Sequence, residues 1–332
     1  MKTKHFISTV LFAWMLALAL PAFAADEKKA DDKAPYVQHE NIVYAETDGI
    51  GLVMDIFTPK SNANGLGIVD IASGAWSSDR GKINDHKQAQ MFKIFCERGY
   101  TVFAVRPGSS SKFTVPEMLK NLKQGIRWVK AHSDEYKIDP EKLAITGASA
   151  GGHLSSLAVV TAEDGNPSAK NPLDRFDTRV KCAAVFFPPT DFLYWGGKKM
   201  DLTEAKGPVA QMLAKLLFST PIAEKKAEEI EAAVKSISPL HQVTGKEPPF
   251  LFVHGDADFV VPLQQSQTMV EVLTKNGVSA ELIIKKGGGH PWLTIHEEVG
   301  VAADWIDKQL GNPSAKTDEV KPASDKKDAA GG

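Results

Sequence analysis

Between residues 42 and 310, short apolar runs alternate with longer segments in which apolar residues recur every three or four positions. The short runs predict strands, and the longer pattern predicts amphipathic helices. The segments Ile42–Glu46 and Leu52–Phe57 alternate in polarity, which favours a half-exposed antiparallel hairpin. The other predicted strands are buried: Gly67–Ile71, Thr101–Val105, Leu143–Thr146, Val180–Phe187, Phe250–Val253 and Glu281–Ile284.

Helical patterns separate most of these strands. They include Val115–His132 and Pro262–Asn276, the second with proline at a favourable first position. This alternation predicts an α/β fold with a mostly parallel sheet flanked by helices. One stretch, Leu202–Val234, is rich in Lys and Glu and has no strand pattern. It predicts a small helical cap at about residues 192–240, with an ordinary long surface crossover as the alternative.

The two ends of the chain differ from the middle. Residues 1–24 carry Lys2 and Lys4, an apolar run and the small-x-small sequence of Ala22–Ala24, which predicts a signal peptide. The apolar run is too short to span a bilayer, although a retained anchor is the alternative. Residues 25–34 and 312–332 have the composition of a disordered linker and tail. Residues 35–311 then suit one α/β domain.

The net charge of the chain bears on which kinds of molecule it can bind. The formal net charge is −2, and removing the signal peptide with its two lysines takes it to about −4. With no basic stripe, the chain is not expected to bind nucleic acid. Its two cysteines, Cys96 and Cys182, lie in apolar patterns typical of buried thiols, although an exported location would permit a bond between them. We expect export to the periplasm or the medium, with no stable membrane insertion after cleavage.

Residues 145–152 read Ile-Thr-Gly-Ala-Ser-Ala-Gly-Gly, which places G-x-S-x-G between a predicted strand and a predicted helix. In that setting the motif marks a nucleophilic serine on a strained turn, here Ser149. The glycines on either side remove Cβ atoms that would clash with neighbouring elements, and the helix N-terminus favours developing negative charge. A purely structural turn is the alternative interpretation.

A serine nucleophile needs a base to accept its proton and an acid to orient that base. Downstream, His-Gly-Asp-Ala-Asp at 254–258 follows one strand, and Gly-Gly-Gly-His at 287–290 follows the next. The order serine, acid, histidine predicts His290 as base and Asp258 as acid, with Asp256 as a competing acid. His254 is expected to hold the acid loop, and His153 to pack in the nucleophile helix. His296 lies in the last helix, one turn or more past the glycine loop. No adjacent signature accompanies His39, His86, His132 or His241.

Metal and cofactor motifs are missing from the sequence. The Asp256-x-Asp258 pair lacks the glycine and the closing glutamate of a calcium loop. The glycines at 287–289 are not followed by Lys-Ser/Thr, and no H-E-x-x-H occurs. We therefore expect no metal and no cofactor. The oxyanion donors are expected to be the Ala150 N–H and an N–H from the loop after the third strand, residues 72–76.

With these residues in place, the chain resembles the bacterial carboxylesterase branch of the α/β-hydrolases. It is similar to acetyl-xylan-esterase-like and feruloyl-esterase-like enzymes, near the hormone-sensitive-lipase group. The likeness covers most of residues 42–310 and rests on these segments: Gly147–Leu154, Ser238–Leu240, Pro248–Asp258, Val261-Pro262 and Gly289-His290. In that family the acid stands three residues past the glycine of the His-Gly pair, which favours Asp258 over Asp256.

One departure from the family concerns the oxyanion loop, which usually reads His-Gly-Gly-Gly-Trp. Here residues 72–76 read Ala-Ser-Gly-Ala-Trp. Because the donors are main-chain groups, Gly74 and Ala75 are expected to supply them, but no histidine at position 72 can brace the loop. Since losing one oxyanion donor costs roughly 10²–10³ in rate, the loop bears directly on efficiency.

The resemblance implies a serine esterase that acts through an acyl-enzyme on a small-molecule or polysaccharide ester: an acetyl-xylan, feruloyl or short acyl ester. Trp76, Trp195 and Trp292 are candidates for lining the substrate site, or else ordinary core residues. Two alternatives remain. A prolyl-oligopeptidase-like peptidase shares the acid-loop pattern, although the segment before Ile42 is too short for its usual propeller. A non-catalytic hydrolase-fold binding protein would fit the altered oxyanion loop.

Overall fold

The computed structural model describes residues 33–200, 208–218 and 224–312. The chain divides into two units, Met1–Ala34 and Pro35–Gly332, and the second contains every element discussed below. The predicted signal peptide, residues 25–32 of the predicted linker and residues 313–332 of the predicted tail lie outside the described residues, as do residues 201–207 and 219–223 of the predicted cap.

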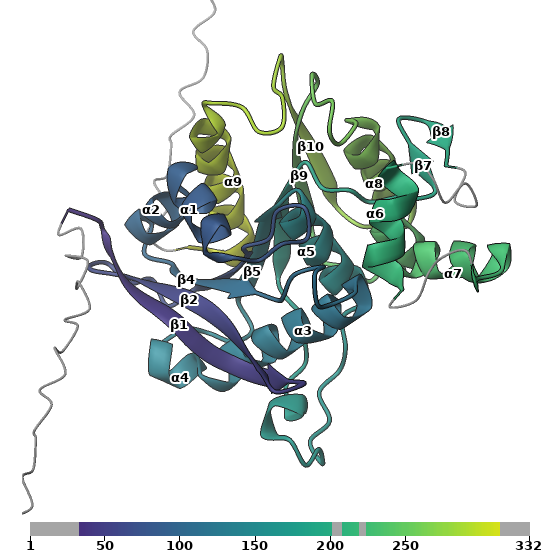
Figure 1. The fold of residues 1–332 in the computed structure, drawn as a ribbon. Helices are drawn as coiled ribbons and strands as arrows, with labels where there is room; N and C mark the ends of the chain where they lie inside the picture. Colours follow the sequence, from purple (N-terminus) through teal and green to yellow (C-terminus); the bar gives the residue numbers. More distant parts are fainter. Residues whose placement is uncertain (1–32, 201–207, 219–223, 313–332) are drawn as a thin grey trace, which may run out of the picture. The chain divides into compact units, whose positions relative to one another are not determined.

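The main sheet of the described residues has eight strands in the order β1-β2-β4-β3-β5-β6-β9-β10 (Figure 1). The first two pairings, β1 with β2 and β2 with β4, are antiparallel, and every other pairing is parallel. The predicted mostly parallel sheet with an antiparallel entry hairpin is therefore confirmed. The strands are β1 (Tyr36–Thr47), β2 (Ile50–Pro59), β3 (Gly67–Ile71), β4 (Thr101–Arg106), β5 (Leu143–Ala148), β6 (Cys182–Phe186), β9 (Phe250–Gly255) and β10 (Ala280–Lys285).

Helices cover both faces of this sheet. α3, α5 and α8 share a core cluster with one face, and α1, α2 and α9 share another cluster with the opposite face. α3 begins where the sequence predicts, with Thr114 and Glu117 forming a capping box. The helices are α1 (Arg80–Gln88), α2 (Met91–Glu97), α3 (Val115–Ala131), α4 (Ser133–Tyr136), α5 (Ala150–Val160), α6 (Pro208–Leu217), α7 (Ala227–Ile237), α8 (Gln264–Lys275) and α9 (Ile295–Leu310).

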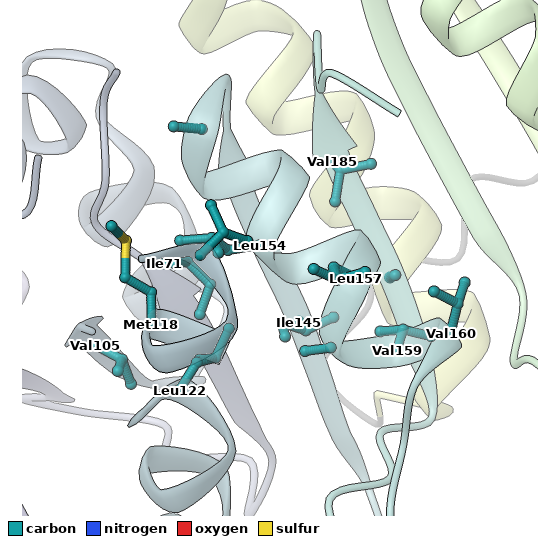
Figure 2. Packing of buried hydrophobic residues seen from close by; sticks show 14 of the residues in the cluster. Ile71, Val105, Met118, Leu122, Ile145, Leu154, Leu157, Val159, Val160 and Val185 are labelled. Carbon is teal, nitrogen blue, oxygen red and sulfur yellow. The ribbon is translucent and has the colours of Figure 1, made fainter. Parts of the chain in front are cut away.

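The two core clusters follow from the alternation of side chains along each strand. On one face, Ile71 and Ile145 of the sheet lie beside Met118 of α3 and Leu154 of α5 (Figure 2). On the other face, neighbouring strand residues pack against α2 and α9. Both cysteines belong to this second cluster as free, buried thiols, and burial raises the pKa of Cys182 to about 12. Burial of both thiols is as predicted.

The predicted helical cap at residues 192–240 is partly wrong. Its described part opens with a two-stranded sheet, β7 (Tyr194–Trp195) and β8 (Lys198–Lys199), before α6 and α7. Gly196 and Gly197 join these strands with positive φ angles of 59° and 78°, as a two-residue type I′ turn requires. The Gly-Gly pair between two short runs was the signal for this hairpin. α6 and α7 add apolar residues to the core cluster of α3 and α5.

Among the described residues, none of the helices combines the length and the apolar character needed to cross a bilayer.

The end of β3 and the start of α5 approach each other very closely. A Cβ on Gly151 would lie 2.2 Å from the Ile71 carbonyl oxygen, and a Cβ on Gly147 would lie 2.6 Å from the Gly151 carbonyl carbon. Real Cβ atoms are not found at such distances from backbone, so only glycine permits this packing. The expectation that these glycines prevent clashes is confirmed.

We predict that Gly151→Ala lowers the free energy of unfolding by about 1–3 kcal/mol, because the added methyl group must push α5 away from β3. Gly300→Ala in α9 is the matched control. A Cβ there meets nothing within 4 Å, so this substitution should stabilise the protein by about 0.4–1 kcal/mol. Urea unfolding measures both. Equal midpoints for the two variants would contradict the packing argument.

Candidate active site

The turn between β5 and α5 holds Ser149 in an unusual backbone conformation. Its φ is 55° and its ψ is −119°, outside the regions that residues with a Cβ ordinarily occupy. The Ser149 N–H donates to the Phe186 carbonyl at 2.9 Å, and the Ser149 carbonyl accepts from the His153 N–H at 2.8 Å. These bonds hold the residue between β6 and its own helix. The strained turn expected from G-x-S-x-G is present.

Two loops at the carboxyl ends of β9 and β10 bring the predicted acid and base to this serine. His290 Nε2 lies 2.9 Å from Ser149 Oγ, and His290 Nδ1 lies 2.7 Å from Asp258 Oδ2. A carboxylate only accepts, so Nδ1 carries the hydrogen and donates to Asp258. Nε2 of the neutral ring is then left to accept the Ser149 hydroxyl hydrogen. Ser149 thus joins two residues more than a hundred positions away in sequence in one hydrogen-bonded chain.

The two candidate acids have separate partners. Asp258 Oδ1 accepts from the N–H groups of Val260 and Val261 at 2.8 and 2.9 Å, and its other oxygen faces His290. Asp256 Oδ1 instead accepts from the Gly287 N–H at 2.6 Å. Asp256 therefore ties the acid loop to the glycine loop that precedes His290. Of the two, only Asp258 has a hydrogen bond to the histidine.

The surroundings of Asp258 favour its charged form. Burial by itself would raise the pKa of this carboxyl, but the His254 ring 3.5 Å from Oδ2 and the hydrogen bonds from His290 and the Val261 N–H outweigh it and hold the pKa well below its usual range. His254 is fully buried and donates from Nε2 to the Val261 carbonyl at 2.8 Å. Its expected role in holding the acid loop agrees with this contact.

In the oxyanion loop, one of the predicted donors is wrong. Gly74 and Ser77 exchange two backbone hydrogen bonds, and the Gly74 N–H donates to the Ser77 carbonyl at 3.0 Å. That N–H is already used, so Gly74 is not a donor as predicted. Among the described residues, no partner is found for the N–H groups of Ala75 and Ala150. Ala150 heads α5, where first-turn N–H groups have no partner within the helix.

Ala75 and Trp76 are the two central residues of this turn, and both have positive φ, at 48° and 54°. Such angles suit glycine or asparagine, and for a bulky residue they cost of order 1–3 kcal/mol. The surrounding structure must therefore hold the turn in place. Trp76 is 5% exposed, and its carbonyl accepts from the Ser110 N–H at 2.8 Å.

A cavity of about 1060 Å³ opens at Ser149 and His290. All three tryptophans predicted to line the substrate site contribute to its wall, although Trp76 is also a core residue. Sequence reasoning missed a polar side of this cavity that α1 supplies. The cavity-facing polar residues of α1 are Lys82, Asp85, His86 and Gln88.

His86 is the most buried member of this polar side. Its Nδ1 lies 2.7 Å from Asp70 Oδ2 on β3. Burial opposes the charged ring, but the Asp70 carboxylate outweighs that and raises the pKa of His86. A buried aspartate inside an apolar strand was the available sequence signal for this pair. In the described ranges, no three His, Cys, Asp or Glu side chains form a group that could hold a metal ion.

The sheet order, the strained serine turn after β5 and the loops after β9 and β10 define an α/β-hydrolase. The BD-FAE family model matches residues 54–273, about two thirds of the sequence. The chain therefore belongs to the BD-FAE family. The matched region includes Ser149 and Asp258 and ends before His290.

The curated relatives include mycobacterial esterases. Over 62% of its length the chain is 31% identical to the "Probable carboxylic ester hydrolase LipM" of Mycobacterium tuberculosis, covering 44% of that protein. It is 28% identical over 64% of its length to "Esterase LipQ" of the same organism, covering 46% of it. The chain thus spans about half the length of these relatives.

Solved structures share the fold over most of the chain. A truncated carbohydrate esterase from gut microbiota superposes with a TM-score of 0.68 at 26% identity, covering 84% of this chain and 98% of that one. A thermophilic esterase from Thermogutta terrifontis superposes with a TM-score of 0.62 at 24% identity, covering 82% and 94%. The second likeness is one of fold alone.

We predict a stability difference between wild type and Asp258→Asn that depends on pH. Because folding lowers the pKa of Asp258 from 3.8, its contribution is complete above about pH 5 and is lost as pH falls below 4. The gap in unfolding free energy should therefore narrow as pH falls from 6 to 3. Urea midpoints at each pH measure it, and a gap that stays constant would refute the assigned environment.

Proposed function

We propose that the protein hydrolyses carboxylic esters with Ser149 as nucleophile, His290 as base and Asp258 as the residue that orients the base. The observation that carries this proposal is the hydrogen-bonded chain from Ser149 Oγ through His290 to Asp258 at the wall of a cavity. The names of the mycobacterial relatives and of the carbohydrate esterase support the reaction class.

The contacts suggest the following order of steps. Ser149 Oγ attacks the ester carbonyl carbon while His290 Nε2 takes the hydroxyl proton. The N–H groups of Ala75 and Ala150 donate to the oxyanion of the tetrahedral intermediate. Its collapse breaks the bond to the alcohol, which leaves with the proton from His290. Water, deprotonated by His290, then attacks the acyl-enzyme, and the carboxylic acid leaves as Ser149 is restored.

Asp258 contributes by holding one tautomer of His290. With Nδ1–H directed at the carboxylate, Nε2 is free to accept a proton, and the ionised carboxylate stabilises the cation that then forms. The low pKa of Asp258 keeps this carboxylate charged across neutral and mildly acidic pH. Protonation of Asp258 should therefore cause no fall in activity across this pH range.

The cavity suits an ester that has both apolar and polar parts. Trp195, Trp292 and Phe187 supply aromatic surface, and α1 supplies charged and amide groups at another part of the wall. Aromatic faces and hydrogen-bonding side chains suit a sugar ester as well as a short acyl ester. An acetylated or feruloylated polysaccharide is the substrate class that the carbohydrate esterase neighbour favours.

We also propose that the protein is exported, because residues 1–24 have the composition of a cleaved signal peptide. A mature chain that begins at Ala25 would establish cleavage, and a chain that retains Met1 in the cytoplasm would rule it out.

We predict that Ser149→Ala lowers kcat for 4-nitrophenyl acetate on the order of 10⁶-fold, to the residual rate expected without a nucleophile. Acetylated xylan, feruloyl and short fatty-acyl esters should lose turnover in parallel, and the panel ranks the substrates. Unchanged turnover in the variant would refute the nucleophile. Peptide nitroanilides cleaved faster than esters by the wild type would favour a peptidase instead.

We predict that Asp258→Asn lowers kcat about 10⁴-fold, because the amide can stabilise the wrong tautomer of His290. Asp256→Asn is the matched control. It keeps an oxygen that can accept from the Gly287 N–H, so its kcat should fall less than about tenfold. Initial rates with 4-nitrophenyl acetate separate the two. A greater loss in Asp256→Asn than in Asp258→Asn would reverse the assignment of the acid.

A further inference from the structure

The strained turn at Ala75 and Trp76 is anchored through the Trp76 side chain. The indole Nε1 donates to His153 Nδ1 at 3.0 Å, and the two rings meet edge to face at 73° with centroids 5.6 Å apart. The Phe192 ring packs against both the Trp76 ring and the His153 ring. Among the described contacts, this is the only hydrogen bond that fixes the Trp76 ring.

The other nitrogen of His153 decides which tautomer is present. His153 Nε2 lies 2.7 Å from the carbonyl oxygen of Ile237, at the C-terminal end of α7. A carbonyl only accepts, so Nε2 carries the hydrogen and Nδ1 is the acceptor that the indole needs. The ring is fully buried, and burial lowers the pKa of His153 to about 4. The neutral form with both bonds made is therefore the form present near neutral pH.

His153 also stands on the helix that carries the nucleophile. Its own N–H donates to the Ser149 carbonyl, one turn earlier in α5. A second link joins the same helix to the loop, because the Gly151 N–H donates to the Ser73 carbonyl at 2.9 Å. Hydrogen bonds to α5 thus hold both the nucleophile and the turn that presents the Ala75 N–H.

We propose that His153 is a positioning residue that sets the oxyanion donor of Ala75 by accepting a hydrogen bond from Trp76. The proposal rests on the proposed esterase function. It also accounts for how a loop without histidine at position 72 is braced: the brace comes from α5 instead. Through Ile237, the last turn of α7 in the cap is joined to the same chain of hydrogen bonds.

Four variants test this proposal. Trp76→Phe keeps a buried ring but removes the donor. His153→Gln places an amide N–H near the position of Nε2 and removes the acceptor at Nδ1. His153→Asn does the reverse, because its side-chain oxygen replaces Nδ1 while the bond to Ile237 is lost. The double variant Trp76→Phe/His153→Gln completes the set. Urea unfolding of each variant and kcat and KM for 4-nitrophenyl acetate are the measurements.

An oxyanion donor acts on the transition state, so its displacement should lower kcat and leave KM unchanged. We expect kcat to fall about 10- to 100-fold in Trp76→Phe and in His153→Gln, less than the loss of a whole donor. His153→Asn should stay within about threefold of wild type in kcat, even if it is the least stable variant. The double variant should be no slower than the slower single variant, because both changes remove the same bond.

Three results would overturn the proposal: wild-type kcat in Trp76→Phe, equal losses of kcat in His153→Asn and His153→Gln, or additive losses in the double variant. If the loss of kcat across the variants correlates with their unfolding midpoints, and not with the loss of the Trp76 hydrogen bond, then His153 contributes to stability alone. Failure of the underlying function is a separate result, because wild type and Ser149→Ala would then hydrolyse the ester equally.

Discussion

The structure depends on one close approach, the contact between the start of α5 and the end of β3. Gly151 brings its backbone so near to the Ile71 carbonyl that no Cβ fits between them. That packing fixes the helix whose first residue follows Ser149 and whose fourth residue is His153. The nucleophile, the free N–H of Ala150 and the anchor of the oxyanion turn therefore move as one body. The loops that carry Asp258 and His290 complete the site from neighbouring strands.

The parts that sequence predicts well are those set by local pattern. The alternation of short apolar runs with helical repeats gave the order of strands and helices, because each pattern has one dominant period. The G-x-S-x-G motif located Ser149 because a Cβ at either of its glycines would clash with neighbouring backbone, so no other residue fits there. The order serine, acid, histidine pointed to His290 and left Asp258 and Asp256 as candidate acids. The family resemblance favoured Asp258, which the fold brings into hydrogen-bonding distance of His290.

The parts that sequence does not predict depend on hydrogen bonds between distant segments. Gly74 and Ala75 were both expected as donors because either main-chain N–H could serve, yet the Gly74 N–H is used within the turn, and only Ala75 of the two presents a free group. Two positive φ angles at Ala75 and Trp76 run against local preference, and contacts from distant segments hold them: the Trp76–His153 hydrogen bond and the Ser110 N–H that donates to the Trp76 carbonyl. The polar face of α1 toward the cavity likewise follows from how that helix is docked.

The central claim is that Ser149 is an activated nucleophile, and fluorophosphonate labelling tests it most directly. The structure predicts one phosphonyl group per chain, located on Ser149 by peptide mass spectrometry, with ester hydrolysis lost in proportion to labelling. The Ser149→Ala variant should take up no label. A wild-type chain that remains unlabelled while folded, or one that is labelled elsewhere and loses activity, would contradict this account of the site.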